Sequence, residues 1–131
     1  DTKGQVRSVI LSEQGFTSTS ATRGKVEDLQ AAAIAYAYYI ADSNPHIDAF
    51  IMSRQVDAPV EVNTSCSFGL YSCDMNQPND IVATMPKPSW YVYKNIDNRR
   101  TTLEVTEEYK QYIGIEKWSD VIPNFRWKNL E

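Results

Sequence analysis

The chain has 131 residues, of which 42% are apolar and 23% are charged, so it can fold around a core as one domain. The formal net charge of −4 argues against nucleic acid as a partner, because phosphate binding needs a basic surface. The longest weakly polar run, residues 31–41, is far shorter than the roughly 20 residues that span a bilayer, so no membrane partner is expected.

Two segments are predicted to form strands on either side of a long helix. Residues 6–13 and 49–52 each contain a run of consecutive apolar residues, which is typical of buried parallel strands. Residues 26–42 are rich in Ala, Leu and Gln, which favour helix. Strand, helix and strand with short connections indicate a βαβ unit with parallel strands. The spacing of apolar residues predicts that the helix buries Val26, Leu29, Ala33, Tyr36, Ala37 and Ile40.

The second half of the chain is less regular. Residues 58–87 are interrupted by prolines, with residues 68–71 as a short extended piece, and Pro88 is suited to open a helix over 88–98. Thr106, followed by two glutamates, is predicted to cap a further helix that Gly114 ends. The inward residues of the helix at 88–98 and of the tail are predicted to be Trp90, Val92, Tyr93, Ile96, Trp118, Val121, Ile122, Phe125 and Trp127.

The cysteines and the histidine set limits on the chemistry. Cys66 and Cys73 form a disulfide if the chain is extracytoplasmic or remain thiols, and both alternatives stay open. We leave the location itself open, with an extracytoplasmic one preferred. Two cysteines and one histidine, His46 in a predicted surface turn, do not suffice for a metal site. The absence of phosphate-binding and dinucleotide-binding glycine motifs gives no reason to expect a cofactor.

Polar residues follow both predicted strands. Glu13 ends the first strand, and Arg54, Gln55 and Asp57 follow the second. Because functional sites of parallel α/β proteins lie beyond the carboxyl ends of the strands, we expect these residues at one rim. A glutamate there can act as a nucleophile or general base when a second acid is near. The alternatives are that Glu13 is a solvated loop carboxylate, that Arg54 neutralises Glu13, and that Asp57 makes a turn.

Several segments, taken in order, carry a resemblance over about residues 7–125: "VILSEQGF", "QAAAIAYAYYI", "IDAFIMSRQVD", "FGLY", "PSWYVYKNID" and "LEVTEEYKQYIGIEKWSDVIPNF". The chain resembles the C-terminal part of a bacterial family of glycoside-hydrolase-like (β/α)8 barrels, a domain of unknown function related to clan A glycosidases. The resemblance implies an α/β fold that comprises strands seven and eight of a TIM barrel with their helices, present here as a fragment, since a full barrel needs about 250 residues.

The resemblance also implies a function. Glu13 would be the nucleophile of a retaining glycoside hydrolase, and the substrate would be a carbohydrate. The acid/base glutamate of such enzymes follows strand four, which is not in this chain, so the isolated chain is expected to be inactive. Tyr71 and Trp90 can stack on a sugar ring, although core packing is the alternative. The substrate-binding residues predicted in this way are Arg54, Gln55, Asp57, Tyr71 and Trp90.

Two other functions fit the same residues. The chain can belong to a non-catalytic carbohydrate-binding barrel, or it can be a self-contained small α/β domain with a structural or interaction role. Only two good parallel strands are predicted, and such a sheet has two open edges and exposed apolar faces. We therefore expect self-association of the chain by strand exchange or by pairing of open edges.

Overall fold

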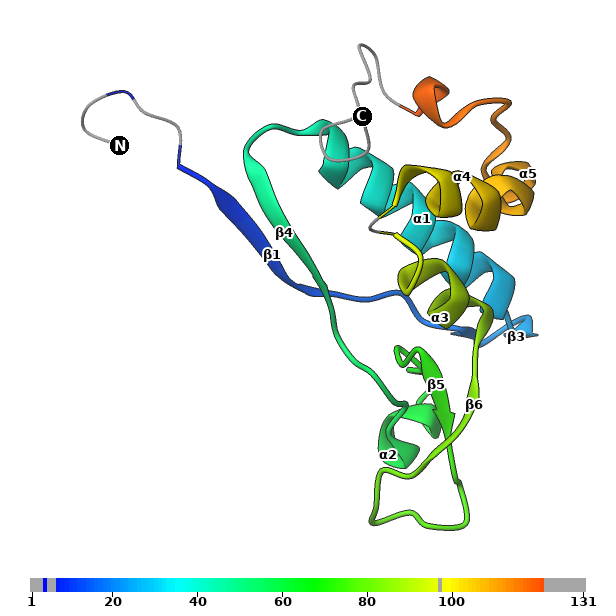
Figure 1. Ribbon diagram of the computed structural model, residues 1–131. Helices are drawn as coiled ribbons and strands as arrows, with labels where there is room; N and C mark the ends of the chain where they lie inside the picture. The colour runs from blue at the N-terminus through cyan, green and yellow to red at the C-terminus, as the bar shows by residue number, and fades with distance from the viewer. Residues whose placement is uncertain (1–3, 5–6, 97, 122–131) are drawn as a thin grey trace.

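The computed structural model describes most of the chain, namely residue 4, residues 7–96 and residues 98–121. Its centre is a parallel pair of strands, β1 (Val9–Gln14) and β4 (Ile47–Met52), connected through α1 (Glu27–Ser43). Figure 1 shows α1 running along one side of the pair. The βαβ unit predicted from the sequence is therefore confirmed.

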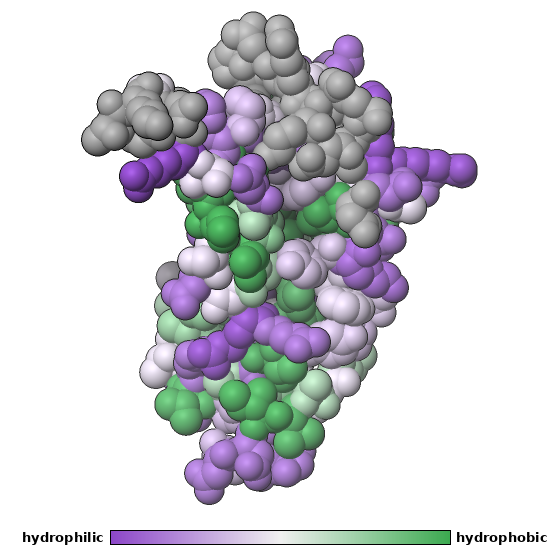
Figure 2. Space-filling model, turned by 60° about the vertical axis from the view of Figure 1, so that its left-hand side comes forward, coloured by the Kyte–Doolittle hydropathy of each residue, from purple (hydrophilic) through white to green (hydrophobic). Residues whose placement is uncertain are grey.

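In the described part of the chain, β1 and β4 are both edge strands. Within the described residues β1 and β4 pair only with each other, so each strand has one outer edge without a neighbouring strand. The register places Val9 opposite Ile47 and Gln14 opposite Met52, with two irregularities between them. Figure 2 shows apolar side chains at the surface of this side of the molecule. The exposed fractions are 44% for Val9, 61% for Ile10 and 46% for Ile51.

The remaining elements are short. Figure 1 shows α2 and the β5–β6 hairpin beyond the carboxyl end of β4, and α3, α4 and α5 on the side of α1. Both β2–β3 and β5–β6 are antiparallel hairpins. These elements are β2 (Thr19–Ser20), β3 (Gly24–Lys25), α2 (Pro59–Val62), β5 (Tyr71–Cys73), β6 (Ala83–Pro86), α3 (Pro88–Tyr93), α4 (Arg99–Thr106), η1 (Glu107–Tyr109), α5 (Lys110–Ile113) and η2 (Trp118–Asp120).

The core lies between α1 and the C-terminal helices. Tyr39 is fully buried there, and its ring stacks on Trp118 with centroids 4.3 Å apart. The Tyr39 hydroxyl shares a hydrogen bond of 2.8 Å with the hydroxyl of Thr106. Burial raises the pKa of Tyr39 to about 12. The inward residues predicted for 88–98 are confirmed. Val92 is buried, and Trp90, Tyr93 and Ile96 pack against the core.

The predicted buried face of α1 is wrong. Leu29 and Tyr36 were expected inside, but they are 37% and 38% exposed. The helix instead buries a stripe of alanines, which allow close approach, together with polar residues whose end groups find hydrogen bonds. Its buried residues are Gln30, Ala31, Ala32, Ile34, Ala35, Tyr38, Tyr39, Ala41 and Asp42.

Two helix boundaries also differ from the prediction. The helix that opens at Pro88 ends at Tyr93, and a separate helix, α4, begins after Asn98, whose side-chain oxygen accepts from two backbone N–H groups of the first turn. Thr106 ends α4 and caps nothing, because its hydroxyl donates to the carbonyl of Thr102. Gly114 ends α5 with a φ of 78°, as predicted. The predicted inward residues Ile122, Phe125 and Trp127 lie outside the described residues.

Candidate functional site

The carboxyl ends of β1 and β4 meet closely. The backbone N–H of Ser53 donates to the carbonyl of Gln14 at 2.8 Å. A Cβ atom at Gly15 would lie 2.7 Å from the carbonyl oxygen of Ser53, so this approach requires glycine. The two segments that follow the strands therefore leave the sheet side by side, one directly after Gln14 and the other toward Arg54.

Glu13 is exposed at this end of β1. Within the described part of the chain its carboxylate has no hydrogen bond and no ion pair. Arg54 is paired with Glu61 of α2 through an Nη2–Oε1 distance of 2.8 Å, with exposed fractions of 39% and 35%. The alternative that Arg54 neutralises Glu13 is therefore wrong, and the Glu13 carboxylate remains accessible.

Glu61 is a site residue that the sequence did not predict. Its Oε1 atom is bound to Arg54, whereas Oε2 is buried and has no hydrogen-bond partner among the described residues. The first turn of α2 begins at Pro59, a favoured first helical residue, which turns the chain directly after the segment of Arg54. The pair thus fixes a carboxylate and a guanidinium together beyond the end of β4.

A buried ion pair lies beneath this rim. Lys87 Nζ is 2.7 Å from Oδ2 of Asp57, and the two side chains are 2% and 5% exposed. Lys87 also donates to the hydroxyl of Ser18 at 2.9 Å, and the backbone N–H of Gly69 donates to Asp57 at 2.7 Å. A Cβ at Gly69 would collide with the backbone of Asp57. Asp57 is thus held inside the molecule, where it joins the segment after β4 to the segment after β1.

Gln30 of α1 extends this buried network. Its Nε2 donates to the carbonyls of Phe16 at 2.9 Å and Gly69 at 3.1 Å, and its Oε1 accepts from the hydroxyl of Ser89 at 2.9 Å. Neither Gln30 nor Lys87 carries a sequence signal of burial, since both residue types are usually exposed. The one local signal is that Lys87 stands between Pro86 and Pro88, which fix the backbone around it.

The remaining predicted site residues lie on the β5 side. Gln55 is exposed, and its backbone carbonyl accepts from the N–H groups of Leu70 and Tyr71, both at 3.0 Å. The rings of Tyr71 and Trp90 are 5.3 Å apart and inclined by 53°. Both side chains pack against the core, as the alternative to sugar stacking predicts. Both are only half-buried, so part of each side chain is accessible to solvent.

The described residues also bear on metal binding, cysteine pairing and membrane-spanning helices. In the described ranges there is no group of three or more His, Cys, Asp and Glu side chains placed to hold a metal ion. Cys66 and Cys73 are both free thiols, and burial, followed by the charge of Asp57, raises the pKa of Cys73. A helix long and apolar enough to cross a membrane is likewise absent from the described residues.

Comparison with known proteins gives a family and no activity. No curated protein and no solved structure matches the chain. A family of unknown function, DUF5722, matches residues 1–121, which is nearly the whole chain. The expected resemblance to a domain of unknown function is confirmed at this level. The chain therefore belongs to the family of unknown function DUF5722.

Proposed function

We propose that this chain contributes the last two parallel strands of a glycoside-hydrolase-like (β/α)8 barrel, with Glu13 as its catalytic nucleophile. The observation that carries the proposal is an exposed carboxylate at the carboxyl end of a parallel strand. Active sites of such barrels lie at this end of the strands. The open outer edges of β1 and β4 support the proposal, because neighbouring barrel strands would pair there.

The residues around Glu13 favour a carbohydrate as the substrate. Sugars offer hydroxyl groups to charged and amide side chains and apolar ring faces to aromatic ones. Arg54 and Gln55 supply the first kind of contact beyond the end of β4, and Tyr71 and Trp90 supply the second. Asp57 has both oxygens engaged by Lys87 and Gly69, so we assign it the role of holding the rim rather than of contacting the sugar.

In the proposed reaction the Glu13 carboxylate attacks the anomeric carbon, and the bond from that carbon to the leaving oxygen breaks. A second carboxylic acid protonates the leaving oxygen, and the same group later takes a proton from the water that hydrolyses the glycosyl ester. Retaining enzymes place the two carboxyl groups about 5–5.5 Å apart. The second acid would come from another barrel strand, so the 131-residue chain alone would not turn over substrate.

The test is Glu13→Gln in the natural protein that carries these residues, with aryl glycosides as substrates. We expect turnover to fall by orders of magnitude with folding unchanged, while Glu116→Gln, which neutralises another exposed glutamate, keeps full activity. A mechanism-based fluorosugar should label Glu13 in the unaltered protein, as mass spectrometry of its peptides would detect. Full activity of Glu13→Gln contradicts the nucleophile. Sugar binding without hydrolysis would identify a non-catalytic carbohydrate-binding barrel, and the absence of both would identify a structural domain.

A further inference from the structure

A second apolar face of α1 has little cover in the described part of the chain. Leu29 and Tyr36 are 37% and 38% exposed, and Ala33, Ala37 and Ile40 are only half-buried. These five residues, which we call the outer stripe, recur at spacings of three or four and therefore lie along one side of the helix. None of them belongs to the core cluster of buried residues. The outer stripe is thus an apolar surface that the fold described so far does not use.

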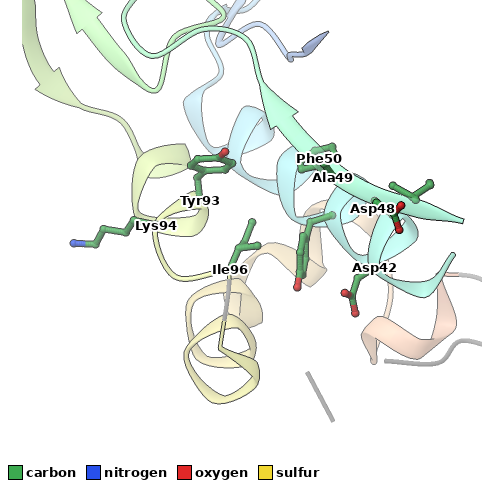
Figure 3. Close-up of a pocket in the computed structure, with 10 residues that line it drawn as sticks. Asp42, Asp48, Ala49, Phe50, Tyr93, Lys94 and Ile96 are labelled. Carbon is green, nitrogen blue, oxygen red and sulfur yellow. The ribbon is translucent and has the colours of Figure 1, made fainter. Parts of the chain in front are cut away.

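The outer stripe lies opposite the packed side of α1. Successive residues of an α-helix are rotated by about 100°, so residues nine apart point in opposite directions. Leu29 is nine residues before Tyr38, which lines a pocket of about 320 Å³ between α1, β4 and α3. Figure 3 shows this pocket, with Tyr93 of α3 at its edge. Ile40 is nine residues after Ala31, which is fully buried. The outer stripe therefore points away from α3.

The composition of α1 is that of a helix covered on all sides. Apart from Gln30, every residue from 29 to 41 is Ala, Leu, Ile or Tyr. A surface helix normally carries charged side chains on its outer face, whereas a helix that is apolar all round is buried. Helices that lie on membranes carry Lys or Arg beside the apolar stripe, but the charged residues of α1 are Glu27, Asp28 and Asp42. A protein segment is therefore the cover that fits.

The shape of the outer stripe favours another helix. The large side chains of Leu29, Tyr36 and Ile40 surround the small Ala33 and Ala37, so the stripe has ridges and a hollow between them. Helices pack by inserting the ridges of one into the grooves of the other, with axes about 8–10 Å apart. The partner helix therefore needs an apolar stripe of its own, with large side chains that face the two alanines.

The order of elements in the proposed barrel indicates which helix this is. Each barrel strand is followed by a helix of the outer ring, so α1 lies between the helix after β4, here α3, and the helix before β1. The outer stripe points away from α3, and β1 has an outer edge without a partner strand in the described ranges. We propose that the helix of the βα unit before β1 packs on the outer stripe in the natural protein.

The test replaces Tyr36 by the photo-crosslinking residue p-benzoylphenylalanine in the natural protein that carries these residues. Irradiation should join position 36 to a peptide from the roughly 30 residues before β1, as mass spectrometry after proteolysis would show. The same replacement of Tyr91, which is 49% exposed on α3, should give no cross-link to that peptide. A link from position 36 to a second copy of the protein, to residues 122–131 or to no peptide at all overturns the proposal.

Thermal stability gives a second readout. Leu29→Lys would place an unpaired charge beneath the partner helix, so the melting temperature of the natural protein should fall by about 5 °C or more. Val60→Lys makes a similar change on α2, where Val60 is 71% exposed, and should shift it by about 1 °C or less. An unchanged melting temperature for Leu29→Lys overturns the proposal.

Hydroxyl-radical footprinting of the unaltered natural protein keeps the proposal testable if Leu29→Lys does not fold. The partner helix should protect Tyr36, so its side chain should be oxidised much more slowly in the folded protein than in the unfolded one. Equal rates of oxidation in the two states overturn the proposal.

This inference rests on the barrel of the proposed function but not on its chemistry, because Glu13 takes no part in the helix contact. The two proposals can therefore fail separately. A cross-link to the segment before β1, together with full activity of Glu13→Gln, would keep the helix contact and remove the nucleophile. Labelling of Glu13 by the fluorosugar, with position 36 cross-linked elsewhere, would keep the nucleophile and remove the helix contact.

Discussion

The buried ion pair between Lys87 and Asp57 gives the strongest prediction of stability. Lys87→Met keeps most of the side-chain length but removes the charge, which leaves the Asp57 carboxylate buried with the backbone N–H of Gly69 as its remaining described donor. Breaking a buried pair by removing one partner costs roughly 3–5 kcal/mol. Domains of this size are stable by about 5–15 kcal/mol, so we expect Lys87→Met to lose a large part of the free energy of unfolding.

The assay is urea unfolding followed by far-ultraviolet circular dichroism. The matched control is Arg100→Met, which breaks an exposed pair with Glu104 on α4, where the two side chains are 87% and 60% exposed. Such a pair contributes about 0.5 kcal/mol or less. Lys87→Met combined with Asp57→Asn should lose less than Lys87→Met alone, because the amide is neutral and still accepts from Gly69. A loss below about 1 kcal/mol for Lys87→Met would refute the reasoning, since it would mean that solvent reaches the carboxylate.

Two further predictions concern the core and one helix cap. The pKa of Tyr39 is raised to about 12, so the unfolded chain ionises near pH 10 before the native state does. Its contribution to stability should be complete below pH 10 and should be lost between pH 10 and 12, by roughly 2–3 kcal/mol, so the decline in urea titrations of Tyr39→Phe should be smaller by that amount. Asn98→Ala should lower the stability by about 1 kcal/mol, because Asn98 accepts from the N–H groups of Arg100 and Thr101, whereas Asn98→Asp should keep the cap in thermal melts.

The βαβ unit could be predicted because its signals are local. The apolar runs of β1 and β4 and the Ala-rich sequence of α1 each determine one element, and the short connections then determine their parallel order. The expected bounds, residues 6–13, 26–42 and 49–52, agree with the structure to within a few residues. This much of the fold requires no knowledge of what packs against it.

The orientation of α1 could not be predicted by the same method. The spacing of large apolar residues predicted that Leu29 and Tyr36 are buried, but both are exposed, and α1 packs against its neighbours through a different face. Alanines let α1 approach α3 closely, and Gln30 is buried because four backbone carbonyls and the Ser89 hydroxyl surround its amide. Which face is buried thus depends on Phe16 before the helix and on partners from Ser67 to Ser89, far beyond its end.

In the candidate site, too, local sequence determines some positions, whereas contacts with distant segments determine others. Glu13 could be placed at the rim because its position depends only on where β1 ends and on the parallel order of β1 and β4. The partners of Arg54 and Asp57 depend on the segment from Ala58 to Lys87, where little periodicity guides a prediction. Since Glu61 takes Arg54, and Lys87 takes Asp57, that irregular segment is what leaves Glu13 without a neutralising partner in the described structure. Any function of Glu13 therefore depends on residues that are far from it in the sequence.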